Sequence, residues 1–403
     1  MSIPVGIERL RVRGFRSVRD ATLRPRSLCA LVGEANAGKS NLLAAVRALL
    51  DPGAPVLAAE DRTRDGSGSI RIEADVAGGG SLVLEDVRGR DAAVSRAGAP
   101  SVLFLPAALR SEAVVAAPVA AGAAGRAAEV LASAFAAQVA PHDRAGSATA
   151  PALSFLHGLE SCCAFGVTGV VLLVEEPELY LRPQAQRYLY RLLRRFADGG
   201  NQVLYSTHAP AFLNVARLEE LALVEHDRKA GTRIVQPEPL PATKDFRALS
   251  EFDSERSELF LARAALLVEG RTEKLVFPFV FQALGRDPDQ EAISIVECGG
   301  KGNLPLFIRI CQATGIPYVV VHDRDAQPGR DPLTGERERN ALIAELAGEE
   351  RTIVLEPDFE GVAGLRGRSR KPERALERFA ATDLDVPEPL ARAAKLVLAL
   401  ARD

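Results

Sequence analysis

The sequence predicts an α/β protein of two domains, with a mixed sheet in the first domain and a doubly wound parallel sheet in the second. Two observations lead to this prediction. The apolar run Leu28–Val32 leads into a glycine-rich loop and then into apolar residues at helical spacing. After residue 257, apolar runs alternate with helical patterns, as expected of a parallel sheet. Since 403 residues suffice for two or three domains, we expect domains at 1–245 and 257–403.

The glycine-rich loop at residues 33–40 matches the phosphate-binding pattern G-x-x-x-x-G-K-[ST] at every fixed position. The backbone N–H groups of such a loop, together with the N-terminus of the following helix, bind anions. We therefore predict ATP as a cofactor, with Lys39 at its β- and γ-phosphates and Ser40 holding Mg²⁺. The predicted nucleotide-binding residues are Gly33, Asn36, Gly38, Lys39, Ser40 and Asn41.

A second apolar run, residues 170–174, ends in the carboxylates Glu175 and Glu176. A continuous apolar run of this length is typical of a buried parallel strand, which delivers the acids to the edge where ligands bind. We predict that Glu175 binds Mg²⁺ and that Glu176 is catalytic and orients the attacking water. His208 follows the next strand, so we interpret it as a sensor of the γ-phosphate rather than as a packed loop residue.

The remainder of the first domain has a different pattern. Residues 7–23 carry five arginines and are expected to form an opening strand with a solvated basic face; a DNA-facing role is the alternative. Residues 69–76 and 81–87 alternate between apolar and polar residues and predict an antiparallel hairpin. Residues 111–150 are rich in alanine and are expected to form a short helical insertion, with a low-complexity linker as the alternative.

The order of these motifs resembles that of the ATPase domain of the ATP-binding-cassette superfamily. The phosphate loop, the acidic strand, a turn at 179–183 and His208 stand in the order found in that superfamily. There are two departures. Glu175 stands where most such ATPases have Asp, and the signature that contacts a partner's nucleotide is degenerate at residues 153–158, where Leu-Ser and a later Gly remain.

Four carboxylates follow two of the predicted strands of the second domain. Glu269 and Glu273 lie four residues apart at a helix start, while Asp323 and Asp325 follow a later strand. Convergent carboxylates repel one another unless cations neutralise them, and hard oxygen ligands suit Mg²⁺ or Mn²⁺. Two such ions can support phosphodiester cleavage. The alternative is a set of helix-capping and surface acids, which the ordered recurrence after apolar strands makes less favourable.

This half resembles a Toprim domain, and an ATPase followed by Toprim resembles the overcoming-lysogenisation-defect (OLD) family of nucleases. The resemblance implies that Glu269, Glu273, Asp323 and Asp325 bind metal and that Glu269 is also catalytic. It further implies an acid after a later strand, which we assign to Glu360, with Glu356 and Asp358 as alternatives. It also implies a catalytic lysine, for which Lys371 is the candidate; a solvated basic run that contacts phosphate is the alternative.

The resemblance implies an ATP-regulated, metal-dependent DNA endonuclease or nickase. Two alternatives stay open: a RecF-like ATP-dependent DNA clamp with a non-catalytic Toprim scaffold, and a Toprim ribonuclease. Because nucleotide sites of this superfamily are completed by a second subunit, we expect a homodimer or a higher even oligomer. DNA is the expected substrate, and a helicase-like protein is a further expected partner.

Composition sets limits on these expectations. The formal net charge is −3, so contact with nucleic acid must come from local patches. Neither an apolar run of transmembrane length nor a signal peptide is evident, and five cysteines show no metal-ligand spacing. We therefore expect a cytoplasmic protein with reduced thiols and no membrane partner.

Overall fold

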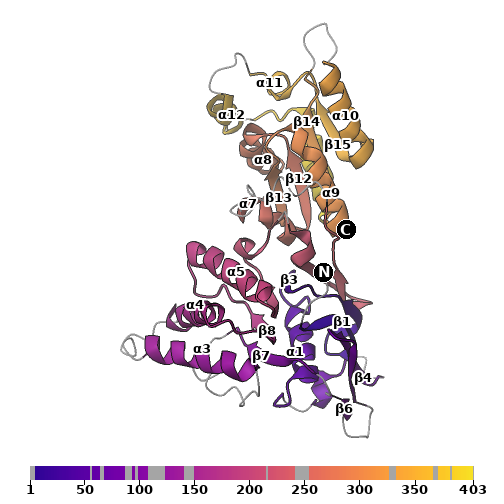
Figure 1. Ribbon diagram of the computed structural model, residues 1–403. Coiled ribbons are helices and arrows are strands. Elements are labelled where there is room, and N and C mark those ends of the chain that lie inside the picture. Colours follow the sequence, from indigo (N-terminus) through magenta and orange to yellow (C-terminus); the bar gives the residue numbers. More distant parts are fainter. Residues whose placement is uncertain are drawn as a thin grey trace. The chain divides into compact units, whose positions relative to one another are not determined.

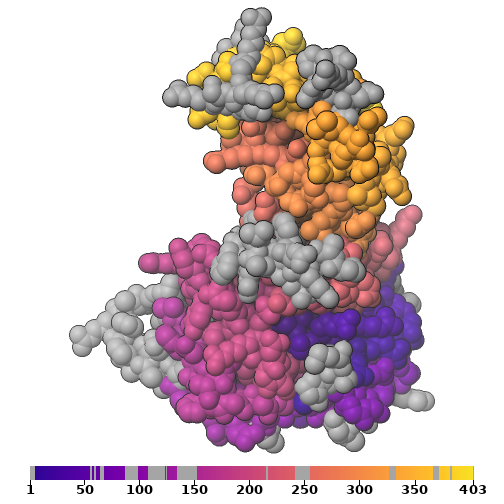
Figure 2. Space-filling model, turned by 45° about the horizontal axis from the view of Figure 1, so that its top comes forward, coloured from indigo at the N-terminus to yellow at the C-terminus, as the bar shows by residue number. Residues whose placement is uncertain are grey.

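The computed structural model divides into two compact units, residues Met1–Glu238 and Pro239–Asp403. Figure 1 shows the helices and strands of both units. Figure 2 shows their surfaces, the first from indigo to magenta and the second from salmon to yellow. The structure describes residues 5–54, 57–63, 68–86, 93–95, 99–107, 123–139, 149–214, 217–240, 254–325, 333–365, 371–381 and 384–402.

The first unit contains two sheets with the helix α1 (Lys39–Leu50) packed between them. One sheet is antiparallel, in the order β2-β1-β4-β5-β6. Its strands are β1 (Ile7–Phe15), β2 (Val18–Leu23), β4 (Ile70–Val76), β5 (Gly80–Asp86) and β6 (Ala93–Ser95). The alternation of residues 70–76 is confirmed, since Ile70, Ile72, Ala74 and Val76 are buried.

The second sheet of this unit has six strands in the order β11-β10-β3-β9-β8-β7. All neighbouring pairs are parallel except β10 and β11. The strands are β3 (Leu28–Val32), β7 (Ser101–Leu105), β8 (Val170–Glu175), β9 (Gln202–Thr207), β10 (Leu221–Asp227) and β11 (Gly231–Val235). The other helices are α3 (Ala123–Val139), α4 (Thr149–Ala164) and α5 (Pro183–Asp198), with 3₁₀ turns at Ala59–Asp61, Pro210–Phe212 and Leu218–Glu220.

The structure corrects one expectation for this unit. Residues 7–23 form two antiparallel strands rather than one, because Arg16 adopts a left-handed φ of 50° and reverses the chain. Three of the five arginines are exposed, whereas Arg11 and Arg13 are half-buried. Acids on neighbouring strands neutralise several of them, as in Arg11–Asp20 at 2.8 Å. Of the predicted insertion at 111–150, α3 and the first residues of α4 are helical; residues 108–122 and 140–148 lie outside the described part.

The second unit is a four-stranded, fully parallel sheet in the order β13-β12-β14-β15. The strands are β12 (Ala264–Val268), β13 (Ile293–Glu297), β14 (Tyr318–Asp323) and β15 (Thr352–Leu355). The helices are α7 (Ser254–Ser257), α8 (Arg271–Ala283), α9 (Leu304–Thr314), α10 (Thr334–Ala347), α11 (Phe359–Val362), α12 (Lys371–Phe379) and α13 (Glu388–Leu400). Short 3₁₀ turns are η5 (Glu258–Leu261), η6 (Lys301–Asn303) and η7 (Glu349–Arg351).

Helices cover both faces of this sheet, so the doubly wound arrangement predicted from the sequence is confirmed. α8 and α13 pack into the apolar core on one face, and α9 and α10 lie on the other, as Figure 1 shows for α8 and α9. Because parallel strands share one direction, the residues that follow β12, β13, β14 and β15 gather at a single edge of the sheet. Residues 241–253 lie outside the described residues.

Candidate nucleotide and metal sites

The phosphate loop joins β3 to α1 and is held by close backbone packing. A Cβ at Gly33 would lie 2.0 Å from the carbonyl oxygen of Val224, and one at Gly38 would lie 2.2 Å from Thr232 Oγ1. Asn36 adopts a left-handed φ of 64°, which asparagine tolerates better than most residues. Only glycine fits at positions 33 and 38, so close packing explains why the phosphate-binding pattern has glycine at both.

Lys39 is buried under the loop. Its ammonium donates hydrogen bonds of 2.8 Å to the carbonyl oxygens of Gly33 and Glu34. Burial lowers the pKa of Lys39, and the nearby carboxylates Glu176 and Glu178 oppose that shift. The hydroxyl-bearing Ser40 is exposed at the start of α1. The lysine therefore lies where a phosphate chain cradled by the loop would meet it.

A hydroxyl network supports the loop from the side. Ser17 Oγ lies 2.8 Å from Thr232 Oγ1, and Thr232 donates to the carbonyl oxygen of Ala37 at 3.1 Å. Asn41, predicted to bind nucleotide, donates its side-chain amide to Ser17 Oγ at 2.8 Å. Its side chain thus braces the loop in the structure. Ser17 and Thr232 were not predicted from the sequence, because the contact between Thr232 and Ala37 joins residues 195 positions apart.

The acids predicted to accompany the loop lie at the C-terminal ends of neighbouring strands. Glu175 ends β8 opposite Ser206 of β9, while Val32 of β3 pairs with Thr207. Glu176 has a left-handed φ of 45°, and its Oε1 lies 3.8 Å from Nε2 of His208. Strained backbone of this kind is concentrated at functional sites. The structure therefore brings Lys39, Glu176 and His208 into one electrostatic neighbourhood, where burial and then Lys39 lower the pKa of His208.

Glu178 is a residue of this site that the sequence analysis did not single out. Its Oε1 accepts hydrogen bonds from Thr207 Oγ1 at 2.8 Å and from the backbone N–H of His208 at 2.7 Å. Burial raises the pKa of Glu178. The sequence Glu-Glu-Pro-Glu could have indicated this role, because its third acid, Glu178, lies close enough to the strand end to reach the neighbouring strand. Glu178 positions the backbone that carries His208.

The degenerate signature at residues 153–158 lies wholly within α4. Ser154, the residue that would have to reach a partner's nucleotide, is completely buried. Its side chain is therefore directed into the unit, and this segment offers no serine to a second subunit.

In the second unit, three of the predicted metal-binding carboxylates lie together at the edge of the sheet. Glu269 follows β12, Glu273 lies in the first turn of α8, and Asp323 ends β14. The backbone N–H of Asp323 donates to Glu269 Oε2 at 3.3 Å, and the N–H of Phe359 donates to Asp323 Oδ1 at 2.7 Å. These contacts tie the two strand ends to the start of α11.

The pKa values of these three carboxyl groups are all raised, chiefly by burial. Burial, with added repulsion from Glu273 and Glu269, raises the pKa of Asp323 to about 8. Burial also raises the pKa of Glu273 to about 7, with smaller contributions from Glu269 and Glu360. The pKa of Glu269 is raised in the same direction, chiefly by burial. A divalent cation would neutralise carboxylates that repel one another in this way. Among the described residues, however, no group of three or more His, Cys, Asp or Glu side chains is already arranged to hold a metal ion.

The fourth predicted ligand, Asp325, makes a different contact. Its φ is 57°, and its Oδ2 is paired with the ammonium of Lys301. Lys301 lies in η6 after β13, and its side chain is only 4% exposed. The sequence analysis did not assign Lys301 a role, although the run Gly299-Gly300-Lys301 follows a predicted strand end.

The alternatives for the later acid differ in their contacts. Glu356 is paired with Arg324, and Asp358 caps α11 by accepting from the N–H of Gly361 at 2.7 Å. Glu360 raises the pKa of Glu273, so it lies within electrostatic reach of the three carboxylates. This geometry favours Glu360 among the three. Lys371 begins α12, but its side chain and the arginines at 366, 368 and 370 lie outside the described part of the structure.

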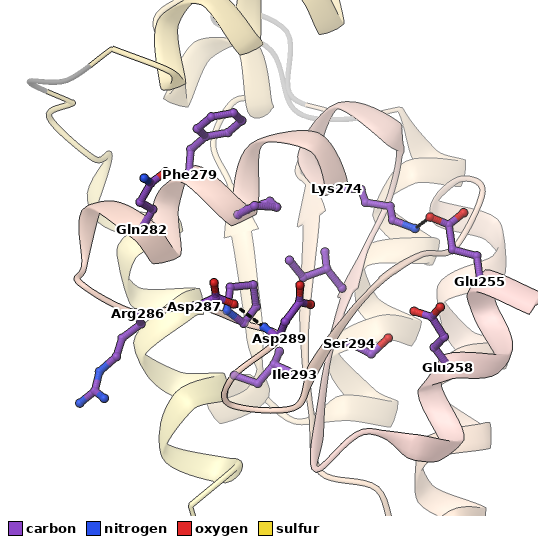
Figure 3. Close-up of a pocket in the computed structure, with 13 residues that line it drawn as sticks. Glu255, Glu258, Lys274, Phe279, Gln282, Arg286, Asp287, Asp289, Ile293 and Ser294 are labelled. Atoms are coloured by element: carbon purple, nitrogen blue, oxygen red, sulfur yellow. Dashed lines mark hydrogen bonds and ion pairs between the residues drawn. The ribbon is translucent and has the colours of Figure 1, made fainter. Parts of the chain in front are cut away.

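A cavity of about 480 Å³ lies elsewhere in the second unit, between α8, the α7–η5 segment and the edge strand β13 (Figure 3). Its wall includes Lys274, whose ammonium is paired with Glu255, and Glu258. None of the predicted site residues lines this cavity. It is therefore separate from the carboxylates at the C-terminal edge of the sheet.

These folds and sites define a phosphate-loop ATPase domain followed by a Toprim domain. Residues 260–325 match the family described as overcoming lysogenization defect protein-like, TOPRIM domain, and residues 141–213 match the family described as AAA ATPase domain. The resemblance to the OLD family is thereby confirmed. In the part of the chain that the structure describes, no helix is long and apolar enough to span a membrane.

Two known nucleases are similar to the chain over parts of their length. The OLD nuclease of Thermus scotoductus is 40% identical over 236 residues, which are 54% of this chain and 45% of that protein. The Old nuclease of Escherichia phage P2 is 29% identical over 164 residues, which are 39% of this chain and 28% of that protein. The chain thus spans less than half the length of these relatives.

Solved structures give weaker matches. The C-terminal region of the Burkholderia pseudomallei OLD protein covers 35% of this chain and 98% of its own, with 21% identity and a TM-score of 0.28. The recombination mediator protein RecF covers 58% of this chain and 99% of its own, with 12% identity and a TM-score of 0.41. The strand order of each sheet, and not these matches, defines the fold.

Proposed function

We propose that the protein is an ATP-regulated, divalent-metal-dependent DNA endonuclease or nickase of the OLD type. The observation that carries the proposal is the convergence of Glu269, Glu273 and Asp323 at the C-terminal edge of the parallel sheet. An acidic site of this kind, in a domain that matches the OLD-like Toprim family, supports phosphodiester hydrolysis.

The metal site would be formed by these three carboxylates, with Asp325 and Glu360 as further ligands. Mg²⁺ or Mn²⁺ bound there would neutralise phosphate charge and lower the pKa of a water molecule. Glu269, held by the backbone N–H of Asp323, would orient that water as well as binding metal. Lys371 at the start of α12 would stabilise negative charge in the transition state.

The first unit would bind ATP and regulate cleavage. Gly33, Asn36 and Gly38 would shape the phosphate cradle, and Lys39 would neutralise the β- and γ-phosphates. Ser40 at the start of α1 and Glu175 at the end of β8 would hold Mg²⁺. Glu176 would orient the water that attacks ATP, and His208, placed 3.8 Å from it, would sense the γ-phosphate.

We further propose that two chains assemble around ATP as a homodimer or a higher even oligomer. The exposed nucleotide loop and the single phosphate-loop motif in the chain support this assembly. DNA is the proposed substrate, and a helicase-like protein is a proposed partner. The five cysteines are free thiols, which supports a cytoplasmic location.

The test is incubation of the purified chain with supercoiled plasmid, with and without ATP, in Mg²⁺, Mn²⁺ or EDTA. Open-circular or linear product in the presence of metal, and none in EDTA, is the expected result. A structured RNA in a parallel reaction distinguishes a ribonuclease. ATP-dependent DNA binding with no cleavage under any metal would overturn the nuclease proposal in favour of a DNA-binding clamp.

A further inference from the structure

The buried ammonium of Lys301 belongs to the carboxylate edge of the second unit, yet the proposed chemistry does not use it. It is paired with Asp325 and lies 3.3 Å from Glu336 Oε2 in the first turn of α10. Three segments therefore meet on one cation: η6 after β13, the residues after β14, and the start of α10. The Lys301 side chain is only 4% exposed, whereas that of Asp325 is 40% exposed, so the ammonium is buried while the carboxylate reaches solvent.

The neighbouring carboxylates are arranged differently. Among the described residues, Glu269, Glu273 and Asp323 form no ion pair with a lysine or arginine; the contacts to Glu269 and Asp323 are backbone N–H groups. The edge of the sheet thus carries two adjacent sets of acids. Lys301 pairs directly with Asp325 and Glu336, whereas it acts on the first set without an ion pair, by lowering the pKa of Glu269 against the effect of burial.

We infer that Lys301 makes the cation positions of this edge unequal, so that a first divalent ion binds at Glu269, Glu273 and Asp323 while a second ion that uses Asp325 must compete with the Lys301 ammonium. This inference rests on the proposed metal site. Its physical basis is charge: a fixed cation that already neutralises a carboxylate repels a divalent ion at the same carboxylate. Lys301 is therefore a positioning residue that regulates occupancy of the second position.

The test is a calorimetric titration of the full chain with Mn²⁺ in nucleotide-free buffer. Wild type is expected to bind two ions, the second at least tenfold more weakly than the first. Lys301→Met should tighten the second step at least tenfold and change the first step much less, because Lys301 acts on Glu269 without pairing with it. Lys301→Arg should keep the second step weak, because the charge remains. Asp325→Asn should reduce the stoichiometry from two ions to one.

Lys274→Met is the matched control. Lys274 is also paired with a glutamate in this unit, Glu255, but it lies in the separate cavity beside β13 (Figure 3). Its removal should leave both binding steps unchanged. Circular dichroism shows whether each variant is folded. If Lys301→Met does not fold, Lys301→Arg and Asp325→Asn still test the inference.

The titration distinguishes a failure of the proposed metal site from a failure of the proposed role of Lys301. If wild type binds no Mn²⁺, the metal site itself is wrong. If wild type binds two ions with equal affinity, or if Lys301→Met loses the second ion while keeping the first, the competing role of Lys301 is overturned and the metal site stands. A stoichiometry of two in Asp325→Asn would also overturn it.

Discussion

The carboxylate of Glu178 accepts a 2.7 Å hydrogen bond from the backbone N–H of His208. The same oxygen, Oε1, accepts from Thr207 Oγ1 at 2.8 Å, so a single buried acid fixes the end of β9. Across this strand end, Glu176 lies 3.8 Å from the His208 ring. Adjacent acids therefore make different contacts: Glu178 holds the backbone, and Glu176 lies beside the His208 ring.

The first prediction concerns that division. Glu176→Gln should bind ATP as tightly as wild type, because the lysine and the loop are untouched, but should hydrolyse it at least a hundredfold more slowly, since the water loses its orienting carboxylate. Fluorescent-nucleotide binding and phosphate release measure the two quantities. Equal hydrolysis by variant and wild type would remove Glu176 from the role.

A second prediction concerns the loop glycine Gly33. Gly33→Ala should lower the melting temperature and abolish ATP binding, because the new Cβ would lie 2.0 Å from Val224 O. Gly78→Ala is the matched control, since Gly78 also has a positive φ, 91°, but a Cβ there meets nothing within 4 Å. The control should cost only backbone strain, about 1–2 kcal/mol, and should bind ATP normally. Similar losses in both variants would contradict the steric account.

A third prediction concerns pH and the buried Glu220. Burial raises the pKa of Glu220 to about 7, although Tyr190 donates to it at 2.7 Å and arginines lie nearby. A raised carboxyl pKa favours the protonated form in the folded state, so its contribution to stability is present below about pH 4.5 and is lost as pH rises toward 7. Glu220→Gln should therefore melt a few degrees higher than wild type at pH 8 and equally at pH 4.5. Thermal unfolding across this range checks it, and a variant that melts lower at pH 8 would show that the ionised form is the stable one.

Much of both cores could be predicted from local pattern. Leu28–Val32 and Ala264–Val268 are short apolar runs that end in glycine or acid, and they form strands with those boundaries. Local pattern failed at Arg16, where a non-glycine residue with positive φ makes the turn between β1 and β2. Gly14, with a φ of 68°, lies two residues before this position, but the turn itself falls on Arg16 and Ser17, so the two strands were expected as one.

The carboxylate edge shows the same limit. Strand ends predicted that Glu269 and Asp323 converge, because parallel strands finish at one edge. The pairing of Asp325 with Lys301 and Glu336 could not be predicted, since it depends on how η6 and α10 pack around the sheet. Likewise, the support that Thr232 gives to Ala37 depends on β11 lying beside the loop, which no local spacing encodes.

A fourth prediction concerns assembly. Glu176→Gln with ATP should be a dimer or a higher even oligomer, because unhydrolysed nucleotide would hold two phosphate-loop sites together. Multi-angle light scattering with ATP, and with no nucleotide as the control, measures the mass. A strict monomer with ATP under conditions that saturate the site would contradict the proposed homodimer.

The final prediction separates the two sites within one chain. Asp323→Ala removes a carboxylate that binds the N–H of Phe359 and lies beside Glu269, so metal binding and placement of the water should both fail. Lys39→Ala should show the opposite pattern, with ATP hydrolysis lost and basal cleavage retained. ATP hydrolysis and the far-ultraviolet spectrum of Asp323→Ala should stay close to those of wild type, because the phosphate loop lies in the other unit.

The measurement that tests the central claim most directly is nicking of supercoiled plasmid by Asp323→Ala and wild type in Mn²⁺, with ATP hydrolysis followed in the same samples. The account predicts a loss of cleavage on the order of a hundredfold or more, with hydrolysis retained. Cleavage by Asp323→Ala at the wild-type rate would contradict it, because the carboxylate edge of the second unit would then not be the nuclease site.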